Sequence, residues 1–224
     1  MKKFFTLIAA VAMAASVNAQ VISFDTDYAA GTVPSPINSD GLVLTITDTN
    51  NKISVDANTA YFGTKDSYVK FEKRLKTGGK SSSKNTMTLT LPADGTLKVY
   101  ARTGSNSALD RNIILTQDGT ELVNKILLES EAVSVEMSSD AGPVNKNVYP
   151  VIAVAAKKGD VVITYPTNSI SIYGLELTSG TNGISSVNAA EAKAEGATFN
   201  LLGQKVAANA KGLVVKNGKK FINK

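Results

Sequence analysis

The chain has 224 residues, a formal net charge of +5, and no cysteine, histidine or tryptophan. The absence of cysteine excludes disulfides, cysteine nucleophiles, thiolate metal sites and a lipid-modified cysteine anchor. The absence of histidine excludes a Ser-His-Asp triad, imidazole acid–base catalysis and a histidine zinc site, and the absence of tryptophan removes the commonest stacking surface for sugars.

The N-terminal segment has the pattern of an export signal. Lys2 and Lys3 are basic, residues 4–15 are apolar, and Val17-Asn18-Ala19 is a small-residue cleavage pattern. The apolar run is shorter than the ~20 residues that span a bilayer, and no later stretch is a transmembrane candidate. We therefore expect residues 1–19 to be a signal peptide.

The charge is distributed unevenly along the chain. The signal contributes +2 and the residues from Thr181 onward contribute +5, which leaves residues 20–180 with −2. A basic tail can indicate nucleic-acid binding, but these lysines lie at expected β-turns with few aromatic residues among them. We therefore expect no nucleic-acid partner.

Strand patterns dominate residues 21–178, and turn signals separate them at roughly 8–12-residue spacing. This pattern predicts an all-β fold, an antiparallel β-sandwich of jelly-roll-like type, over residues 20–178. Residues 179–197 are the expected linker, and residues 198–224 the expected small C-terminal β-hairpin module.

Within the sandwich, alternating residues mark strands at 42–46, 87–91 and 97–101. The last two flank a turn at 92–95 and predict a half-buried antiparallel hairpin. Asp118-Gly119 lies between two apolar strands and predicts a second hairpin.

Further along, the expected elements are less regular. Residues 138–147 are polar and predict a loop, while the apolar run 148–155 predicts a central strand. The apolar face changes across Gly174, which predicts a β-bulge there.

In the tail, Asn217-Gly218 predicts a type I′ hairpin turn, because Asn and Gly accept positive φ most readily. Lys216 then faces Lys219, and Val214 faces Phe221. A second, tighter turn at Leu202-Gly203 joins residues 198–201 to 204–206.

This tail resembles the C-terminal sorting domain of the type IX (Por) secretion system. That family carries an aromatic-Asn-Leu-x-Gly-Gln-basic-Val stretch, a Lys-Gly-aliphatic strand, an Asn-Gly-Lys-Lys turn and a last hydrophobic-basic strand. The matching positions are Phe199, Asn200, Leu201, Gly203, Gln204, Lys205, Val206, Lys211, Gly212, Val214, Gly218, Lys219 and Lys220. Longer members open with Pro-Asn-Pro, whereas residues 183–195 contain no proline, so the tail resembles a short variant.

The resemblance implies recognition by the secretion machinery of the outer membrane. It also implies an extracellular or outer-surface location, or the periplasm if the tail is not an active sorting signal. Residues 97–105, Arg111, the strand at 113 and residues 171–177 are similar to jelly-roll, carbohydrate-binding-like modules of secreted polysaccharide-degrading enzymes. No sugar-contact residue is carried over from that second resemblance.

Five residues are candidate binding residues on their own chemistry. Arg102 and Arg111 could hold a uronate carboxylate between them, or form loop salt bridges with neighbours such as Asp110. Tyr68 and Tyr100 fall on the polar phase of their strands, where they could stack on sugars or cover a core edge.

Metal and catalytic candidates are weaker. Asp25 with Asp27, and Asp48 with Asn50, could hold structural calcium, but turn chemistry is the simpler role, and we expect no cofactor. Glu129 and Glu131 would share a face if extended, as a glycosidase pair requires, but no supporting residues are visible. We expect no catalytic residue.

The sequence therefore favours a secreted, non-catalytic surface protein that binds a glycan or another surface component. A structural or adhesive protein that binds protein partners is the alternative, and it predicts an exposed apolar patch or an open edge strand. A lyase or glycosidase is the third hypothesis and predicts a deep pocket with convergent charged groups.

Overall fold

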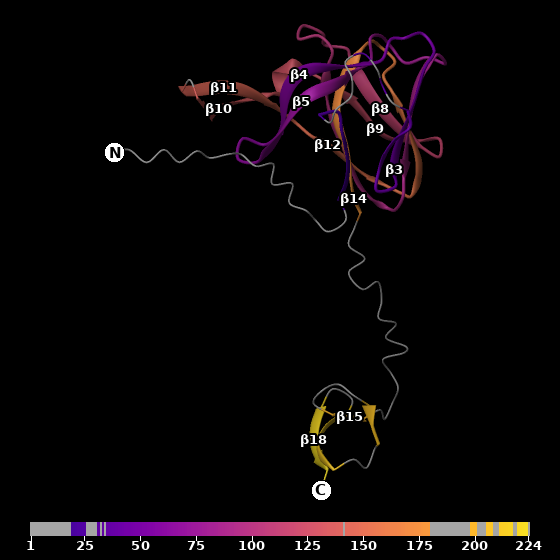
Figure 1. Cartoon of the computed structure of the whole chain (residues 1–224), viewed down its shortest axis with the longest axis vertical. Coiled ribbons are helices and arrows are strands. Elements are labelled where there is room, and N and C mark those ends of the chain that lie inside the picture. The colour runs from indigo at the N-terminus through magenta and orange to yellow at the C-terminus, as the bar shows by residue number, and fades with distance from the viewer. Residues whose placement is uncertain are drawn as a thin grey trace. The chain divides into compact units, whose positions relative to one another are not determined.

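The computed structural model describes residues 19–25, 31, 33, 35–140, 142–179, 198–200, 205–207, 211–216 and 219–223. The chain divides into two units, residues 1–181 and residues 182–224 (Figure 1). Apart from Ala19, the expected signal peptide lies outside the described residues, and so does the linker after Ser179.

The first unit contains two mostly antiparallel sheets, which confirms the predicted all-β sandwich. Sheet A has the order β10-β11-β4-β5-β14-β7-β12, and β1 pairs with β14. Its strands are β1 (Ala19–Ser23), β4 (Ser54–Gly63), β5 (Tyr68–Lys76), β7 (Gly95–Thr103), β10 (Val133–Ser139), β11 (Gly142–Tyr149), β12 (Ile152–Ala156) and β14 (Ile170–Ser179).

Sheet B has the order β2-β3-β6-β13-β8-β9. Its strands are β2 (Ile37–Ser39), β3 (Leu42–Asp48), β6 (Asn85–Leu91), β8 (Asn112–Gln117), β9 (Thr120–Ile126) and β13 (Gly159–Thr164). A single turn of 3₁₀ helix, η1 (Glu129–Glu131), follows β9.

The main core lies between the two sheets, where alternate residues of each strand meet. Leu44 and Leu89 from sheet B, and Leu97 and Leu175 from sheet A, are fully buried there. Each such side chain contributes roughly 1.5–3 kcal/mol when it leaves water, so alternation fixes which face of each strand turns inward.

Sheet A also carries an apolar layer on its outer face. This outer aromatic cluster consists of Ala60, Phe62, Phe71, Tyr100, Tyr149 and Tyr173. Ring centroids lie 5.0 Å apart for Phe71 and Tyr100 and 5.1 Å apart for Phe62 and Tyr173, within the range of favourable aromatic pairs. Sheet A is therefore packed on both faces over these strands.

The predicted hairpin of residues 87–101 is wrong in its pairing, although both strands exist. β6 pairs with β3 and β13 in sheet B, whereas β7 pairs with β14 and β12 in sheet A. The turn between them carries the chain from one sheet to the other. Two strands with one apolar face each can meet edge to edge or face to face, and here they meet face to face.

The prediction for residues 138–155 is also wrong. β10 and β11 form an antiparallel ribbon where a polar loop was expected. The apolar run then breaks at Pro150, and β12 is the end strand of sheet A instead of a central one. Polar residues line one face of the ribbon because that face has no sheet against it. The polar composition of residues 138–147 is therefore the same as that of a loop.

Two local predictions are confirmed. β8 and β9 form the expected hairpin, and Asp118 and Gly119 both have positive φ, at 49° and 75°. The register of β14 against β7 shifts between Ile172 and Gly174, which is the expected bulge.

The second unit is a four-stranded sheet with the order β16-β15-β17-β18. Its strands are β15 (Thr198–Asn200), β16 (Lys205–Val206), β17 (Gly212–Lys216) and β18 (Lys219–Asn223). Lys216 faces Lys219 and Val214 faces Phe221, which confirms the predicted pairings of the last hairpin. Thr198 faces Val206 in the pairing of β15 with β16. Residues 201–204, 217 and 218, which carry the expected turns and part of the sorting pattern, lie outside the described residues.

Candidate binding pocket at the edge of the sandwich

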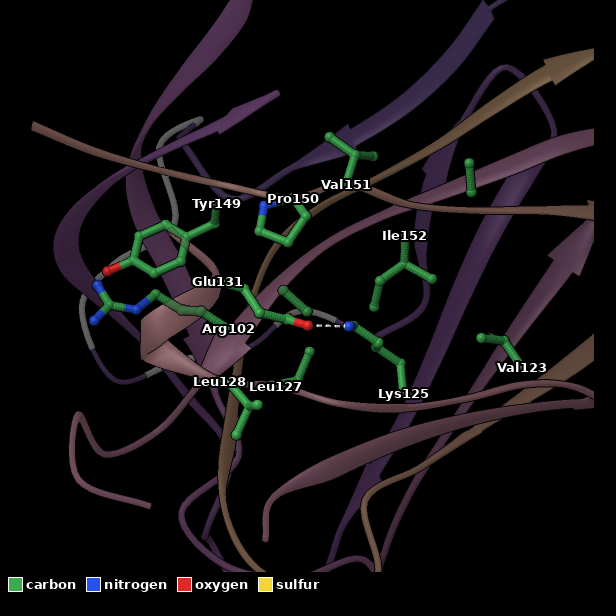
Figure 2. A pocket seen from close by; sticks show the side chains of 12 residues that line it. Arg102, Val123, Lys125, Leu127, Leu128, Glu131, Tyr149, Pro150, Val151 and Ile152 are labelled. Carbon is green, nitrogen blue, oxygen red and sulfur yellow. Dashed lines mark hydrogen bonds and ion pairs between the residues drawn. The ribbon is translucent and has the colours of Figure 1, made fainter. Parts of the chain in front are cut away.

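A pocket of about 300 Å³ opens beside β9 and β12, the end strands of the two sheets (Figure 2). This volume is at the lower end of the range of roughly 300–1,000 Å³ that is usual for small-ligand sites. The lining residues are Ala101, Arg102, Val123, Lys125, Leu127, Leu128, Glu131, Tyr149, Pro150, Val151, Ile152 and Ala153.

One part of the pocket wall is apolar. Leu127 and Ile152 are buried, at 4% and 8% exposure, and Val123, Leu128 and Val151 are partly buried. The backbone N–H of Leu127 donates to the carbonyl of Arg111 at 2.8 Å, which holds the segment after β9 in place. This part of the wall presents hydrocarbon to a ligand.

The other part carries two ion pairs. Lys125 of β9 pairs with Glu131 of η1, and Figure 2 shows this pair inside the pocket. Arg102 of β7 donates from one nitrogen, Nη2, to both carboxylate oxygens of Glu129, at 3.0 and 3.1 Å. Both cations are thus held by carboxylates from the same short 3₁₀ turn.

Tyr149 joins the pocket to the outer aromatic cluster. The Arg102 guanidinium lies over the Tyr149 ring, with Cζ 4.5 Å from the ring centroid, which is a cation–π geometry. The Tyr149 hydroxyl donates to Glu129. Burial, and then the bond to Glu129, raise the pKa of Tyr149 well above its ordinary value, so the phenol stays protonated and remains a donor.

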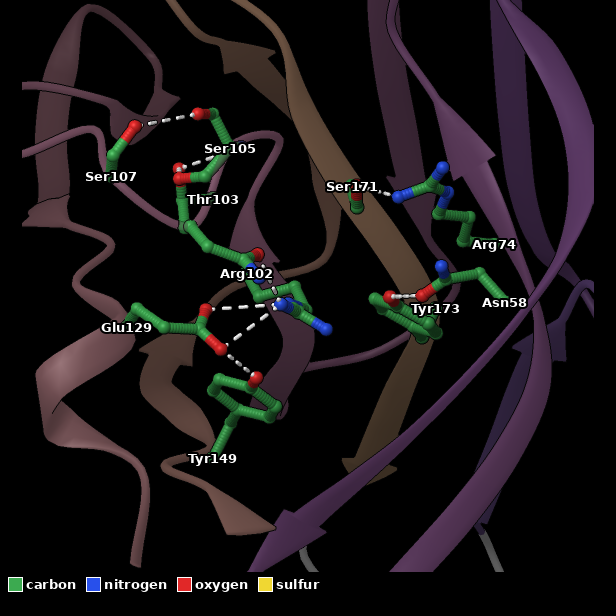
Figure 3. A network of polar contacts seen from close by, with 11 residues as sticks. Asn58, Arg74, Arg102, Thr103, Ser105, Ser107, Glu129, Tyr149, Ser171 and Tyr173 are labelled. Atoms are coloured by element: carbon green, nitrogen blue, oxygen red, sulfur yellow. Dashed lines mark hydrogen bonds and ion pairs between the residues drawn. The ribbon is translucent and has the colours of Figure 1, made fainter. Parts of the chain in front are cut away.

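A second polar group lies across the outer face of sheet A (Figure 3). Arg74 of β5 binds Asp56 of β4 through Nε at 2.7 Å and Nη2 at 3.2 Å, and reaches Ser171 at 3.3 Å. Tyr173 donates its hydroxyl to Asn58. Burial raises the pKa of Tyr173, while the nearby guanidiniums of Arg102 and Arg74 oppose that rise.

Of the predicted binding residues, Arg102 lies in the pocket wall. Tyr100 points to the outer face as its strand phase predicts, but Phe62 and Phe71 pack on it and leave it 5% exposed. Of its two possible roles, Tyr100 therefore covers a core edge, and its ring is not open for stacking on a sugar. Its hydroxyl donates to Glu176 at 2.5 Å.

The other predicted residues lie outside the pocket lining. Tyr68 is partly exposed at the start of β5, with its ring edge-on to Tyr61 at 6.0 Å. Asp110 is exposed, and Arg111 donates to the carbonyl and hydroxyl of Ser169 at 2.7 and 2.6 Å. Arg102 and Arg111 therefore bind different residues of the chain, Glu129 and Ser169, and do not share one carboxylate. Binding by these residues stays a prediction.

Sequence reasoning missed most of the pocket, including Lys125, Leu127 and Ile152. It considered Glu131 only as one of an extended carboxylate pair, and that geometry is wrong. In η1 the two carboxylates bind different cations, Glu129 with Arg102 and Glu131 with Lys125. Pro150 was the available signal that the apolar run 148–155 is interrupted and leads into an end strand of the sheet.

Two of the acidic residues considered for calcium, Asp25 and Asp48, have structural partners. Asp48 accepts the backbone N–H groups of Lys52 and Ile53, at 2.9 and 2.7 Å, and thus fills the expected turn role. Asp25 accepts those of Glu72 and Lys73, both at 2.7 Å, whereas Asp27 lies outside the described residues. The described residues contain no cluster of three or more metal-ligating side chains. They also contain no helix with the length and hydropathy to span a membrane.

No family model and no curated protein sequence matches the chain. Among solved structures, the K1 cleaved adhesin domain of Lys-gingipain from Porphyromonas gingivalis W83 is similar in part. It is 9% identical, and the match covers 73% of this chain and 99% of that one with a TM-score of 0.39. A similarity at this level is too low to transfer a function.

Proposed function

We propose that the sandwich is a non-catalytic carbohydrate-binding domain and that the pocket beside β9 and β12 receives a sugar residue. The observation that carries the proposal is the division of its wall into hydrocarbon and fixed ion pairs. A sugar ring has the same division, because its C–H groups form apolar patches and its hydroxyls lie around the edge.

The apolar wall formed by Leu127, Leu128 and Val151 suits the C–H face of the ring. The ion pair of Lys125 and Glu131 offers both donors and acceptors to hydroxyls, because each group has further hydrogen-bonding capacity beyond its partner. Because Arg102 and Lys125 are each paired with a carboxylate, a neutral sugar suits this wall better than an acidic one.

The ion pairing of the charged side chains in the pocket wall also supports a role without catalysis. The charged lining residues Arg102, Lys125 and Glu131 are each tied in an ion pair. A general acid or base needs a proton-exchanging group directed at the substrate with a matched pKa. Fixed ion pairs suit recognition better than proton transfer.

The test is a glycan array probed with the mature chain and two matched variants. Ala153 and Ala155 are both exposed on β12, but only Ala153 lines the pocket. Ala153→Trp should fill the pocket and abolish the signal on those glycans that the unmodified chain retains, whereas Ala155→Trp should preserve it. A blank array with the unmodified chain, or equal binding by both variants, would contradict the proposal.

We also propose that the chain is exported and sorted to the outer surface of the cell. The signal-like residues 1–19 and the tail pattern support this, and β17 and β18 pair as the pattern predicts. The outer-membrane secretion machinery is then the partner of the tail.

A further inference from the structure

A two-stranded ribbon made of β10 and β11 forms one end of sheet A, and Figure 1 shows it projecting from the body of the sandwich. It pairs with β4 only at its base, through Val148 with Tyr61 and Tyr149 with Phe62. An isolated two-stranded ribbon is only marginally stable in water, so its exposed surfaces favour a partner.

The two faces of this ribbon differ. Cross-strand pairs Val133–Val148, Val135–Lys146 and Met137–Val144 lie on one face. Val133 is 50% exposed, and Val135, Met137 and Val144 are partly exposed. The other face carries Ser134, Glu136, Ser138, Pro143, Asn145 and Asn147. One face is thus mainly apolar and incompletely covered.

The outer side of β10 is an open backbone edge, since no described strand pairs with it. The other sheet ends are shorter or carry protection: β2 has three residues, β12 has five, and β9 contains Glu121 and Lys125 beside a bulge. β10 has seven residues in unbroken register, no proline, no lysine and a single acidic residue. It therefore lacks the usual devices that prevent edge pairing.

We propose that β10 pairs with β10 of a second copy of this chain, antiparallel, about a two-fold axis at Val135. In this register Val135 faces its own copy and Val133 faces Met137, so the two apolar faces become continuous. A two-fold axis requires such a self-complementary patch, and this strand provides one.

Charge disfavours the neighbouring register that has its axis at Glu136. An axis at Glu136 would place two carboxylates directly opposite each other, which destabilises a strand pair. A shift of the pairing by one residue would bring the apolar face of one copy beside the polar face of the other. With the axis at Val135, Glu136 faces Ser134 of the second copy instead.

The dimer would join two sheets A across the ribbons and carry two pockets. Two linked sites bind a repetitive polymer far more tightly than one site does, because the second contact is intramolecular. The association itself does not depend on what the pockets bind.

Single-cysteine variants test the pairing, because the chain has no cysteine of its own. Directly opposed Cβ atoms in an antiparallel pair are about 4.5–5.5 Å apart, near disulfide geometry. Mild oxidation of mature Val135→Cys should therefore give a covalent dimer. Val133→Cys alone should not, but it should cross-link when mixed with Met137→Cys.

Sedimentation equilibrium of the mature chain provides the second measurement. We expect a reversible dimer that Val135→Lys abolishes, because it places two ammonium groups face to face. Val144→Lys lies on the same ribbon face but one strand away from the edge, and should keep the dimer. A monomer at the highest attainable concentration overturns the proposal. So does a dimer that Val135→Cys fails to cross-link, which would place the contact elsewhere.

Discussion

At the scale of single residues, Arg102 connects the pocket to the rest of the fold. Its guanidinium covers the ring of Tyr149 and binds Glu129, and its side chain is 15% exposed. The sequence singled out Arg102 because it and Arg111 could hold a carboxylate between them, but the carboxylate that Arg102 binds in the fold lies 27 residues away. Residue chemistry identified a candidate, whereas the partner depended on tertiary structure.

Replacement of Arg102 should therefore destabilise the protein. Arg102→Met leaves the Glu129 carboxylate partly buried without its cation, and we expect the free energy of unfolding to fall by about 1–3 kcal/mol. Urea unfolding at pH 7 measures this. The double variant Arg102→Met/Glu129→Gln should lose less than the sum of the two single variants, and strict additivity would show that the pair does not interact.

Glu176 predicts a pH dependence of stability. Burial opposes ionisation, but hydrogen bonds from Lys98 and Tyr100 outweigh it and lower the pKa of Glu176 from its ordinary 4.5. A lowered pKa in the folded state stabilises the fold above pH 4.5, and the contribution is lost as pH falls through the folded value. Melting temperatures should show Glu176→Gln less stable than the parent at pH 7, with the difference shrinking towards pH 3. A constant difference would rule out this linkage.

At the scale of elements, strand positions followed from residue alternation but strand partners did not. Leu89 in β6 and Leu97 in β7 belong to strands with the same apolar-polar pattern, yet they lie in opposite sheets. A residue pattern of period two indicates which face of a strand is buried, but it does not indicate which neighbouring strand pairs with its edge. The hairpin at Asp118-Gly119 was predictable because its turn residues themselves specify the connection.

The bulge at Gly174 gives a prediction at this scale. A Cβ at this position would lie 2.9 Å from Cε1 of Phe71, whose ring packs in the outer aromatic cluster. We expect Gly174→Ala to lower the free energy of unfolding by about 1–3 kcal/mol, as overpacking usually does.

Gly79→Ala is the matched control, because no heavy atom lies within 4 Å of the position that a Cβ would take there. Its effect should stay within about 0.5 kcal/mol. Chemical denaturation of both variants measures the difference, and an equal effect of the two substitutions would show that the contact with Phe71 is unimportant.

At the scale of the whole molecule, the fold class was predictable and the pocket was not. The pocket assembles from β7, from the segment between Val123 and Glu131, and from the chain around Pro150. None of these carries a binding motif by itself, because the division of the wall into apolar and charged parts exists only after the two sheets pack. The pairing of β17 with β18 was predictable because Asn217-Gly218 in the sequence specifies the register of that hairpin.

The sorting proposal also belongs to this scale. Deletion of residues 198–224 removes the whole tail sheet and should leave the protein in the periplasm, because the outer-membrane machinery then has nothing to recognise. Fractionation of the producing cells, with a periplasmic marker as control, measures this. Unchanged surface exposure after the deletion would refute a sorting role for the tail.

The proposal that the pocket binds carbohydrate is tested most directly by NMR titration of the mature chain with a sugar identified on the array. Backbone amide shifts should change along β9, around Leu127 to Glu131 and at the start of β12, and saturate with one binding curve. Ala155→Trp should retain these changes and Ala153→Trp should lose them. Shift changes confined to the Tyr61 and Tyr68 end of the sandwich, or no saturable change, would contradict a binding site in this pocket.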